Sequence, residues 1–124
     1  MVEQSGHDPD EVIVATADEV TPGTTKKFML PTPDAPVEAF VVNFDGELHA
    51  WVNRCRHVPL TMDWVENRFL DESGEHIVCA THGAMYEPNT GACIAGPAFG
   101  RSLIRVPIRV AHGQVLARVP EELR

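Results

Sequence analysis

The chain lacks the features that mark several classes of protein. It has no run of about eighteen apolar residues, the minimum for a membrane-spanning helix. Its first residues, MVEQSGHDPDEV, contain neither a basic start nor an apolar stretch. We therefore expect no secretory signal and a cytoplasmic protein. Repeats and low-complexity segments are also missing, and 124 residues predict a single domain.

Basic residues and cysteines are scarce. The chain has 10 Lys and Arg against 18 Asp and Glu, which gives a net charge of −8. This charge argues against nucleic acid and anionic membranes as partners. It would suit a partner with a basic docking patch, although solubility alone also accounts for such a charge. Three cysteines in a chain of this kind favour metal binding over a disulfide framework.

Short apolar segments separated by turn residues dominate the chain, a pattern that predicts an all-β sandwich or barrel. Asp45-Gly46 is the strongest hairpin signal. Residues 1–10 are expected to form a disordered tail, and 11–124 the domain. The expected strands are Val12–Ala15, Lys26–Leu30, Val37–Phe44, Glu47–Asn53, Glu75–Val78, Met85–Glu87, Ala92–Ile94, Leu103–Val110 and Gln114–Val119, with a helical turn within 58–64.

Two short runs carry the chemistry, Cys55-Arg56-His57 and Cys79-Ala80-Thr81-His82. Each places one thiolate close to one imidazole at what we expect to be the tip of a loop. Two Cys and two His in this arrangement suit a [2Fe–2S] cluster. Two thiolates bind one of its irons, and two imidazoles bind the other. An imidazole in place of a thiolate removes negative charge and raises the reduction potential.

The same four residues allow other interpretations. Cys2His2 sets often bind zinc, although such sites usually start from a Cys-x2–4-Cys knuckle that this chain lacks. Cys55 and Cys79 could instead form a disulfide or be inert buried thiols. The third cysteine, Cys93, is interpreted as a small core residue and not a ligand. We assign no role in the site to the other histidines, which are His7, His49, His76 and His112.

The sequence around the second run narrows these alternatives. It continues as His82-Gly83-Ala84-Met85-Tyr86, followed by Asn89-Thr90-Gly91 and Gly96-Pro97. With this context the chain resembles the Rieske iron–sulfur family over about Val12 to Val119. The resemblance implies three antiparallel sheets and a small cluster-binding subdomain at about 53–99. It also implies one [2Fe–2S] cluster, with Cys55, His57, Cys79 and His82 as iron ligands and Gly83, Tyr86, Gly96 and Pro97 around it.

The chain departs from the family's high-potential members at three positions. Leu60 and Thr81 stand where those members have the cysteines of a disulfide that bridges the two ligand loops. Ala84 stands where they have a serine that bonds to a cluster sulfur, whereas Tyr86 matches the tyrosine that bonds to a ligand sulfur. The resemblance therefore implies a lower potential. Extra residues around 66–74 leave the subfamily open.

The resemblance implies an electron-transfer protein and not an enzyme. We expect a ferredoxin-like carrier between a reductase and an oxygenase or other oxidoreductase. A small subunit of a larger oxidoreductase, or a redox-sensing interaction module, remains an alternative. Ring-hydroxylating oxygenases add an iron bound by two His and a carboxylate, and we find no second set at ligand spacing. We expect the partner to approach the edges of His57 and His82, within a rim of Arg56, Val58, Pro59 and Met85.

Overall fold

The computed structural model describes residues 11–33, 35–54, 69–70, 75–79, 83–96 and 99–123. These residues form nine strands in three antiparallel sheets of three strands each, and two short 3₁₀ helices. The all-β prediction is confirmed. The strands are β1 (Glu11–Thr16), β2 (Thr25–Leu30), β3 (Val37–Phe44), β4 (Glu47–Val52), β5 (Ile77–Val78), β6 (Met85–Tyr86), β7 (Cys93–Ala95), β8 (Ile108–Ala111) and β9 (Gln114–Arg118), and the 3₁₀ helices are η1 (Ala17–Glu19) and η2 (Glu121–Leu123).

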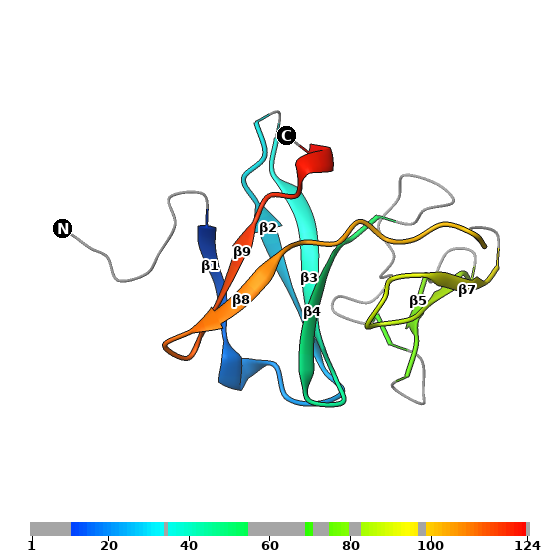
Figure 1. Ribbon diagram of the computed structural model, residues 1–124, viewed down its shortest axis with the longest axis horizontal. Coiled ribbons are helices and arrows are strands. Elements are labelled where there is room, and N and C mark those ends of the chain that lie inside the picture. The colour runs from blue at the N-terminus through cyan, green and yellow to red at the C-terminus, as the bar shows by residue number, and fades with distance from the viewer. Residues whose placement is uncertain are drawn as a thin grey trace.

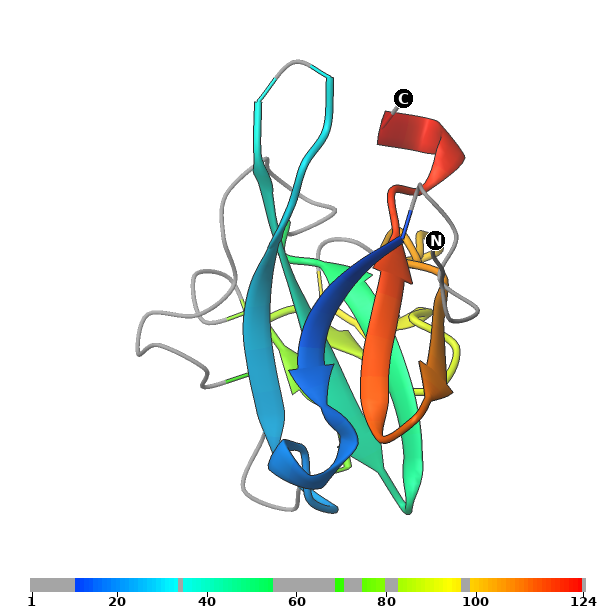
Figure 2. The ribbon, with the colours of Figure 1, turned by 90° about the vertical axis from the view of Figure 1, so that its left-hand side faces the viewer.

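The three sheets have the strand orders β1-β9-β8, β2-β3-β4 and β5-β6-β7. The first two lie against each other and form the larger body, in which β1 and β2 are neighbours (Figure 2). The third sheet lies to one side of this body, beyond β3 and β4 (Figure 1). The sheet β2-β3-β4 is therefore the middle layer of the molecule.

Strand β3 is buried on both faces because it separates two apolar cores. Ala39 and Val41 belong to the core that the first two sheets share. Phe40 and Val42 point the other way and pack in a second core with residues of the third sheet. Side chains alternate along a strand, so a strand covered on both sides reads as a nearly continuous apolar run. The third sheet is thus held by side chains of the central strand.

The Asp45-Gly46 hairpin forms as predicted. The φ angles of Asp45 and Gly46 are 54° and 89°, and β3 pairs with β4 in unbroken register on either side of the turn. Two consecutive residues with positive φ are the mark of the type I′ turn, whose twist matches that of paired strands. The last hairpin turns in the same way at His112 and Gly113, with φ of 54° and 76°.

The segment before β8 differs from the prediction. Instead of a strand from Leu103 to Val110, β8 begins at Ile108, and residues 103–107 run along the edge of β4. The amide of Val52 donates to the carbonyl of Ile104, and the amide of Val106 donates to the carbonyl of Ala50, each at 2.9 Å. Pro107 has no N–H to donate to a ladder, and the chain leaves β4 for β9 there.

Other predicted elements are shorter or lie outside the described residues. The strand expected at Glu75–Val78 is reduced to the two residues of β5. The tail at 1–10 and the helical turn within 58–64 fall outside the described residues, as does most of 66–74. Among the residues that the structure describes, no helix is long and apolar enough to cross a membrane.

Candidate metal centre

Cys79 is the one predicted iron ligand that the structure describes. It directly follows β5 and is fully buried. Its amide donates to the carbonyl of Ala84, and the amide of Gly83 donates to the carbonyl of Cys79, each at 2.8 Å. These two hydrogen bonds close the ends of the predicted second ligand loop. The backbone of Cys79 is therefore held by the described residues on the other side of this loop, Gly83 and Ala84.

Gly83 closes this loop with a φ of +71°. A side chain is strained in this left-handed region, and glycine is not. Apart from its chain neighbours, no atom of the described residues lies within 4 Å of the position that a Cβ would take. Within the described chain the backbone conformation therefore calls for glycine, whereas the close passage to a cluster that the sequence suggests remains a prediction.

Gly96 holds a second loop against the first. Its φ is +94°, and a Cβ there would lie only 2.7 Å from the Cα of Ala84. Contact this close is possible only for glycine. Gly96 thus lies beside Ala84, at the end of the predicted second ligand loop. The proline-containing loop over the cluster that the family resemblance implies remains a prediction. Pro97 lies outside the described residues.

Tyr86 and Cys93 lie in the same buried core as Cys79. They are paired across β6 and β7, and both side chains are buried. The Cys93 thiol donates to the carbonyl of Ala95 at 3.2 Å, and Cys93 is a free cysteine. Its interpretation as a core residue is confirmed. The bond from Tyr86 to a ligand sulfur remains a prediction.

An aromatic pair anchors the segment between the two predicted ligand loops. The ring of Phe69 stacks on Phe40 of β3, with centroids 3.9 Å apart and planes 10° from parallel. The carbonyl of Phe69 accepts a hydrogen bond from the amide of Val78 at 2.7 Å. Phe69 thus fixes the entry to β5, and so to Cys79, on the middle sheet. Nothing in its sequence context indicated this contact.

A second anchor is built around Trp51 of β4. The guanidinium carbon of Arg105 lies 4.3 Å from the Trp51 ring centroid, and Arg105 Nη2 donates to the carbonyl of Asn89 at 2.7 Å. A Cβ on Gly91 would approach the Trp51 ring to 2.4 Å. The turn between β6 and β7 is therefore held on the indole ring. Sequence reasoning missed Arg105, because the contact joins residues far apart in the chain.

His49 borders this anchor and is half-buried, as predicted. Its Nδ1 lies 3.4 Å from Nη1 of Arg105, and its Nε2 lies 3.6 Å from a carboxylate oxygen of Glu47. Burial lowers the pKa of His49, and the positive charge of Arg105 lowers it further, while Glu47 opposes them. The neutral imidazole is the form that these surroundings favour, and His49 is part of the anchor through its contact with Arg105.

The other three predicted ligands, Cys55, His57 and His82, lie outside the described residues. Among the residues that the structure describes, no three His, Cys, Asp or Glu side chains lie close enough together to hold a metal ion. The residues that are described fit a cluster: a buried cysteine at the base of a loop closed by glycine, with a second loop packed beside it.

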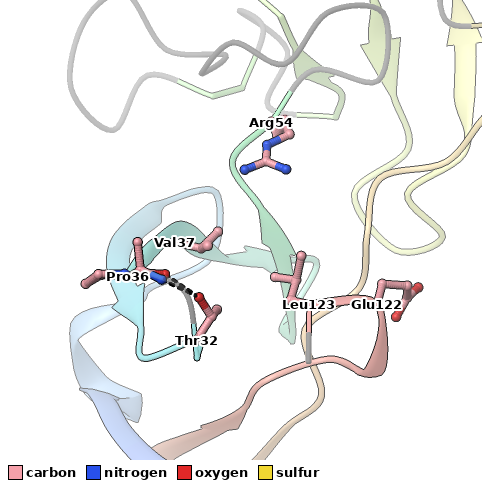
Figure 3. A pocket seen from close by; sticks show the side chains of 7 residues that line it. Thr32, Pro36, Val37, Arg54, Glu122 and Leu123 are labelled. Atoms are coloured by element: carbon pink, nitrogen blue, oxygen red, sulfur yellow. Dashed lines mark hydrogen bonds between the residues drawn. The ribbon is translucent and has the colours of Figure 1, made fainter.

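A shallow pocket lies near the other predicted ligand loop, which begins after Arg54 (Figure 3). The connection between β2 and β3 forms one wall, where the Thr32 hydroxyl donates to the carbonyl of Ala35. Arg54 and η2 form the rest, and the lining residues are Thr32, Ala35, Pro36, Val37, Arg54, Glu122 and Leu123. All of them are exposed or half-exposed.

Several solved structures share this fold, among them proteins of carbazole 1,9a-dioxygenase systems. The terminal oxygenase of carbazole 1,9a-dioxygenase from Novosphingobium sp. KA1 matches 90% of this chain at 22% identity and a TM-score of 0.74. This chain spans only 30% of that oxygenase's length. The ferredoxin of carbazole 1,9a-dioxygenase from Nocardioides aromaticivorans IC177 matches 87% of this chain and 96% of its own, at 22% identity and a TM-score of 0.67.

A third match is a chain from a complex of reduced oxygenase and oxidized ferredoxin of carbazole 1,9a-dioxygenase, with 21% identity and a TM-score of 0.73. It covers 94% of this chain and 100% of its own. At these identities the matches show the fold alone. No curated protein sequence matches the chain significantly.

The family model for the Rieske [2Fe-2S] domain matches residues 10–117. The match includes all four predicted ligands and most of the described body. A domain of this kind holds one [2Fe–2S] cluster. With the fold, the buried Cys79 and the glycine-held loops in place, the chain belongs to the Rieske [2Fe-2S] domain family.

Proposed function

We propose that this protein is a one-electron carrier whose [2Fe–2S] cluster is held by Cys55, His57, Cys79 and His82. The cluster would supply reversible one-electron chemistry, and the protein would hold it in place and set its potential. The observation that carries the proposal is the match to the Rieske domain model over residues 10–117. The ligand loops fall inside this match, and Cys79 lies buried at the base of one of them.

The residues around the ligands have separate roles in this proposal. Cys55 and Cys79 would bind one iron, and the two histidines the other. Gly83 and Gly96 would let two loops approach the cluster, and Pro97 would cover it. Tyr86 would donate a hydrogen bond to a ligand sulfur. We further propose that residues 53–99 form the cluster-binding subdomain of a domain at 11–124.

We propose a reductase as electron donor and an oxygenase as acceptor. The ferredoxin of a carbazole dioxygenase matches this chain over nearly its full length, and a related chain comes from a complex of oxygenase and ferredoxin. These similarities support a carrier that serves an oxygenase. We propose that this carrier is cytoplasmic. The net charge of −8 would favour a basic partner surface.

A second candidate is the Rieske part of a larger oxidoreductase. It is favoured by the terminal oxygenase of Novosphingobium sp. KA1, 30% of whose chain matches this one. The two candidates differ in how they associate. A carrier exchanges electrons in brief encounters, whereas a subunit co-purifies with a catalytic chain.

The test is a cycle of reduction and oxidation on the purified holoprotein. A carrier should accept one electron per chain from dithionite, pass it to a protein acceptor, and return to its first spectrum over repeated cycles. A protein that purifies in a tight complex with a catalytic chain, and transfers electrons only within it, would contradict the carrier and favour the subunit.

A further inference from the structure

An exposed apolar segment begins in β7 and continues into the loop that follows it. Its described residues are Ile94 and Ala95 of β7, and Gly96, Phe99 and Gly100 of the loop; all are exposed and none is charged. The Phe99 side chain is 73% exposed, more than any other large apolar side chain that the structure describes. Single exposed apolar residues are common on protein surfaces. An exposed aromatic ring among uncharged, exposed neighbours in an acidic chain instead indicates an interaction site.

Residues on the two sides of the loop are paired, and these paired residues form its stem. The amide of Cys93 donates to the carbonyl of Arg101 at 2.8 Å, and Ala92 forms a bridge with Ser102. At its tip, the amide of Phe99 donates to the carbonyl of Gly96 at 3.1 Å. Phe99 is therefore tied by its own amide to Gly96, next to a stem whose two sides are paired.

The same loop packs beside the predicted second ligand loop. Gly96 contacts the backbone of Ala84, and the carbonyl of Ala84 accepts the hydrogen bond from the amide of Cys79. Strand β7 lies at the end of the molecule farthest from β1 (Figure 1). The loop that carries Phe99 therefore begins beside Ala84, a described residue at the end of the predicted second ligand loop.

We propose that Phe99 is the apolar anchor by which this carrier docks on a basic redox protein that has an apolar recess beside its redox centre. The proposal rests on the proposed function and adds the residue and the partner chemistry. The net charge of −8 would steer a basic partner from a distance. The charge-free loop would then make the contact without burying an unpaired charge.

One aromatic residue is enough to dominate such an interface. Transient redox encounters bury less than about 1,200 Å², and a few central side chains, often aromatic, carry most of the binding energy. Phe99 is the only described aromatic residue that is largely exposed. Its removal should therefore weaken docking while leaving the charge-driven approach unchanged.

The experiment compares two oxidants of the dithionite-reduced holoprotein in a stopped-flow instrument. Cytochrome c serves as a basic protein acceptor with an apolar haem edge, and ferricyanide as a small acceptor that needs no docking. We expect Phe99→Ala to lower the second-order rate constant with cytochrome c about tenfold. The rate with ferricyanide, and the salt dependence of the cytochrome reaction, should stay unchanged because no charge is removed.

Ile13→Ala is the matched control, because Ile13 is a half-exposed apolar residue on β1 in the larger body. It should leave both rates unchanged. Phe99→Leu keeps an apolar side chain and should slow the cytochrome reaction less than Phe99→Ala. It also provides the test if the alanine variant loses its cluster, which EPR would reveal.

The outcomes separate the two proposals. Equal rates with cytochrome c for wild type and both Phe99 variants would overturn the anchor and leave the carrier function standing. Equal losses for Phe99→Ala and Ile13→Ala would also overturn it. Wild-type protein that reduces ferricyanide but not cytochrome c would also overturn the anchor, because cytochrome c has the chemistry of the proposed partner. Wild-type protein that reduces neither acceptor would contradict the carrier function itself.

Discussion

The indole nitrogen of Trp51 donates a hydrogen bond to the carbonyl of Pro88, with 2.9 Å between the two atoms. Trp51 belongs to β4 of the middle sheet, and Pro88 to the turn after β6 in the third sheet. The bond is buried, so its loss would leave an unpaired donor in the core. This contact, with Arg105 over the same ring, ties the proposed cluster-binding part to the larger body.

Gly91→Ala should destabilise the protein more than Gly113→Ala. Both glycines have a φ of +76°, so each substitution introduces the same backbone strain, of order 1 kcal/mol. At Gly91 the new Cβ would also meet the Trp51 ring at 2.4 Å, whereas at Gly113 nothing lies within 4 Å. The clash should add about 1–3 kcal/mol.

Urea unfolding of the two glycine variants measures the difference, because the shared strain cancels when the variants are compared. Equal losses of unfolding free energy would mean that the turn moves away from Trp51 at no cost. The indole would then not be an anchor.

The reduction potential should lie in the lower half of the Rieske range of about −150 to +300 mV. Ala84 has no hydroxyl to donate to a cluster sulfur, so the reduced and more negative cluster lacks that stabilisation. Ala84→Ser should raise the potential, and Tyr86→Phe should lower it. Protein-film voltammetry on the three proteins measures the shifts. A wild-type value above about +200 mV on this scale would contradict the argument.

Stability should depend on pH through His49. Its pKa is lowered in the folded protein, by burial first and by Arg105 second. The unfolded chain therefore binds a proton at a higher pH than the folded chain does. The stability that the neutral imidazole contributes is complete above the unfolded pKa of about 6.5 and is lost as the pH falls below it.

Denaturant unfolding at a series of pH values tests this with His49→Gln as the comparison, since glutamine is polar and does not titrate. The wild-type protein should lose stability relative to the variant on passing from about pH 7 to lower pH. A constant difference between the two proteins across this range would show that His49 titrates alike in both states.

The sequence predicted the parts of the fold that depend on local chemistry. Asp45-Gly46 indicated its hairpin because two positive φ angles require such residues. The alternation in β4 placed Ala50 and Trp51 on opposite faces, and the structure buries them in different cores. The sequence also supplied the candidate ligands, through the residue types and spacing that a cluster needs.

Contacts between distant residues could not be predicted in this way. Arg105 lies over Trp51 because residues 103–107 run along β4, and Phe69 stacks on Phe40 for a similar tertiary reason. Nothing in the sequence around Phe99 predicted that this aromatic side chain would be exposed. Only the packed chain shows that it stays outside the core.

Alanine substitutions should distinguish the two cysteines that bind the cluster from the one that does not. Cys55→Ala and Cys79→Ala should each lose the cluster, because each removes a thiolate that no neighbour can replace. Cys93→Ala should keep it, since the Cys93 thiol bonds to the carbonyl of Ala95 in the core. Iron and sulfide analysis of the purified variants measures how much cluster each one retains. Retention of the cluster in Cys79→Ala and its loss in Cys93→Ala would reverse the assignment.

Low-temperature EPR of the dithionite-reduced protein tests the central claim most directly. A [2Fe–2S] cluster with two histidine ligands should give one rhombic signal per chain, with pulsed spectra that show coupling to histidine nitrogen. The signal should vanish in Cys79→Ala. A colourless protein that contains zinc, or a reduced cluster without nitrogen coupling, would contradict the account.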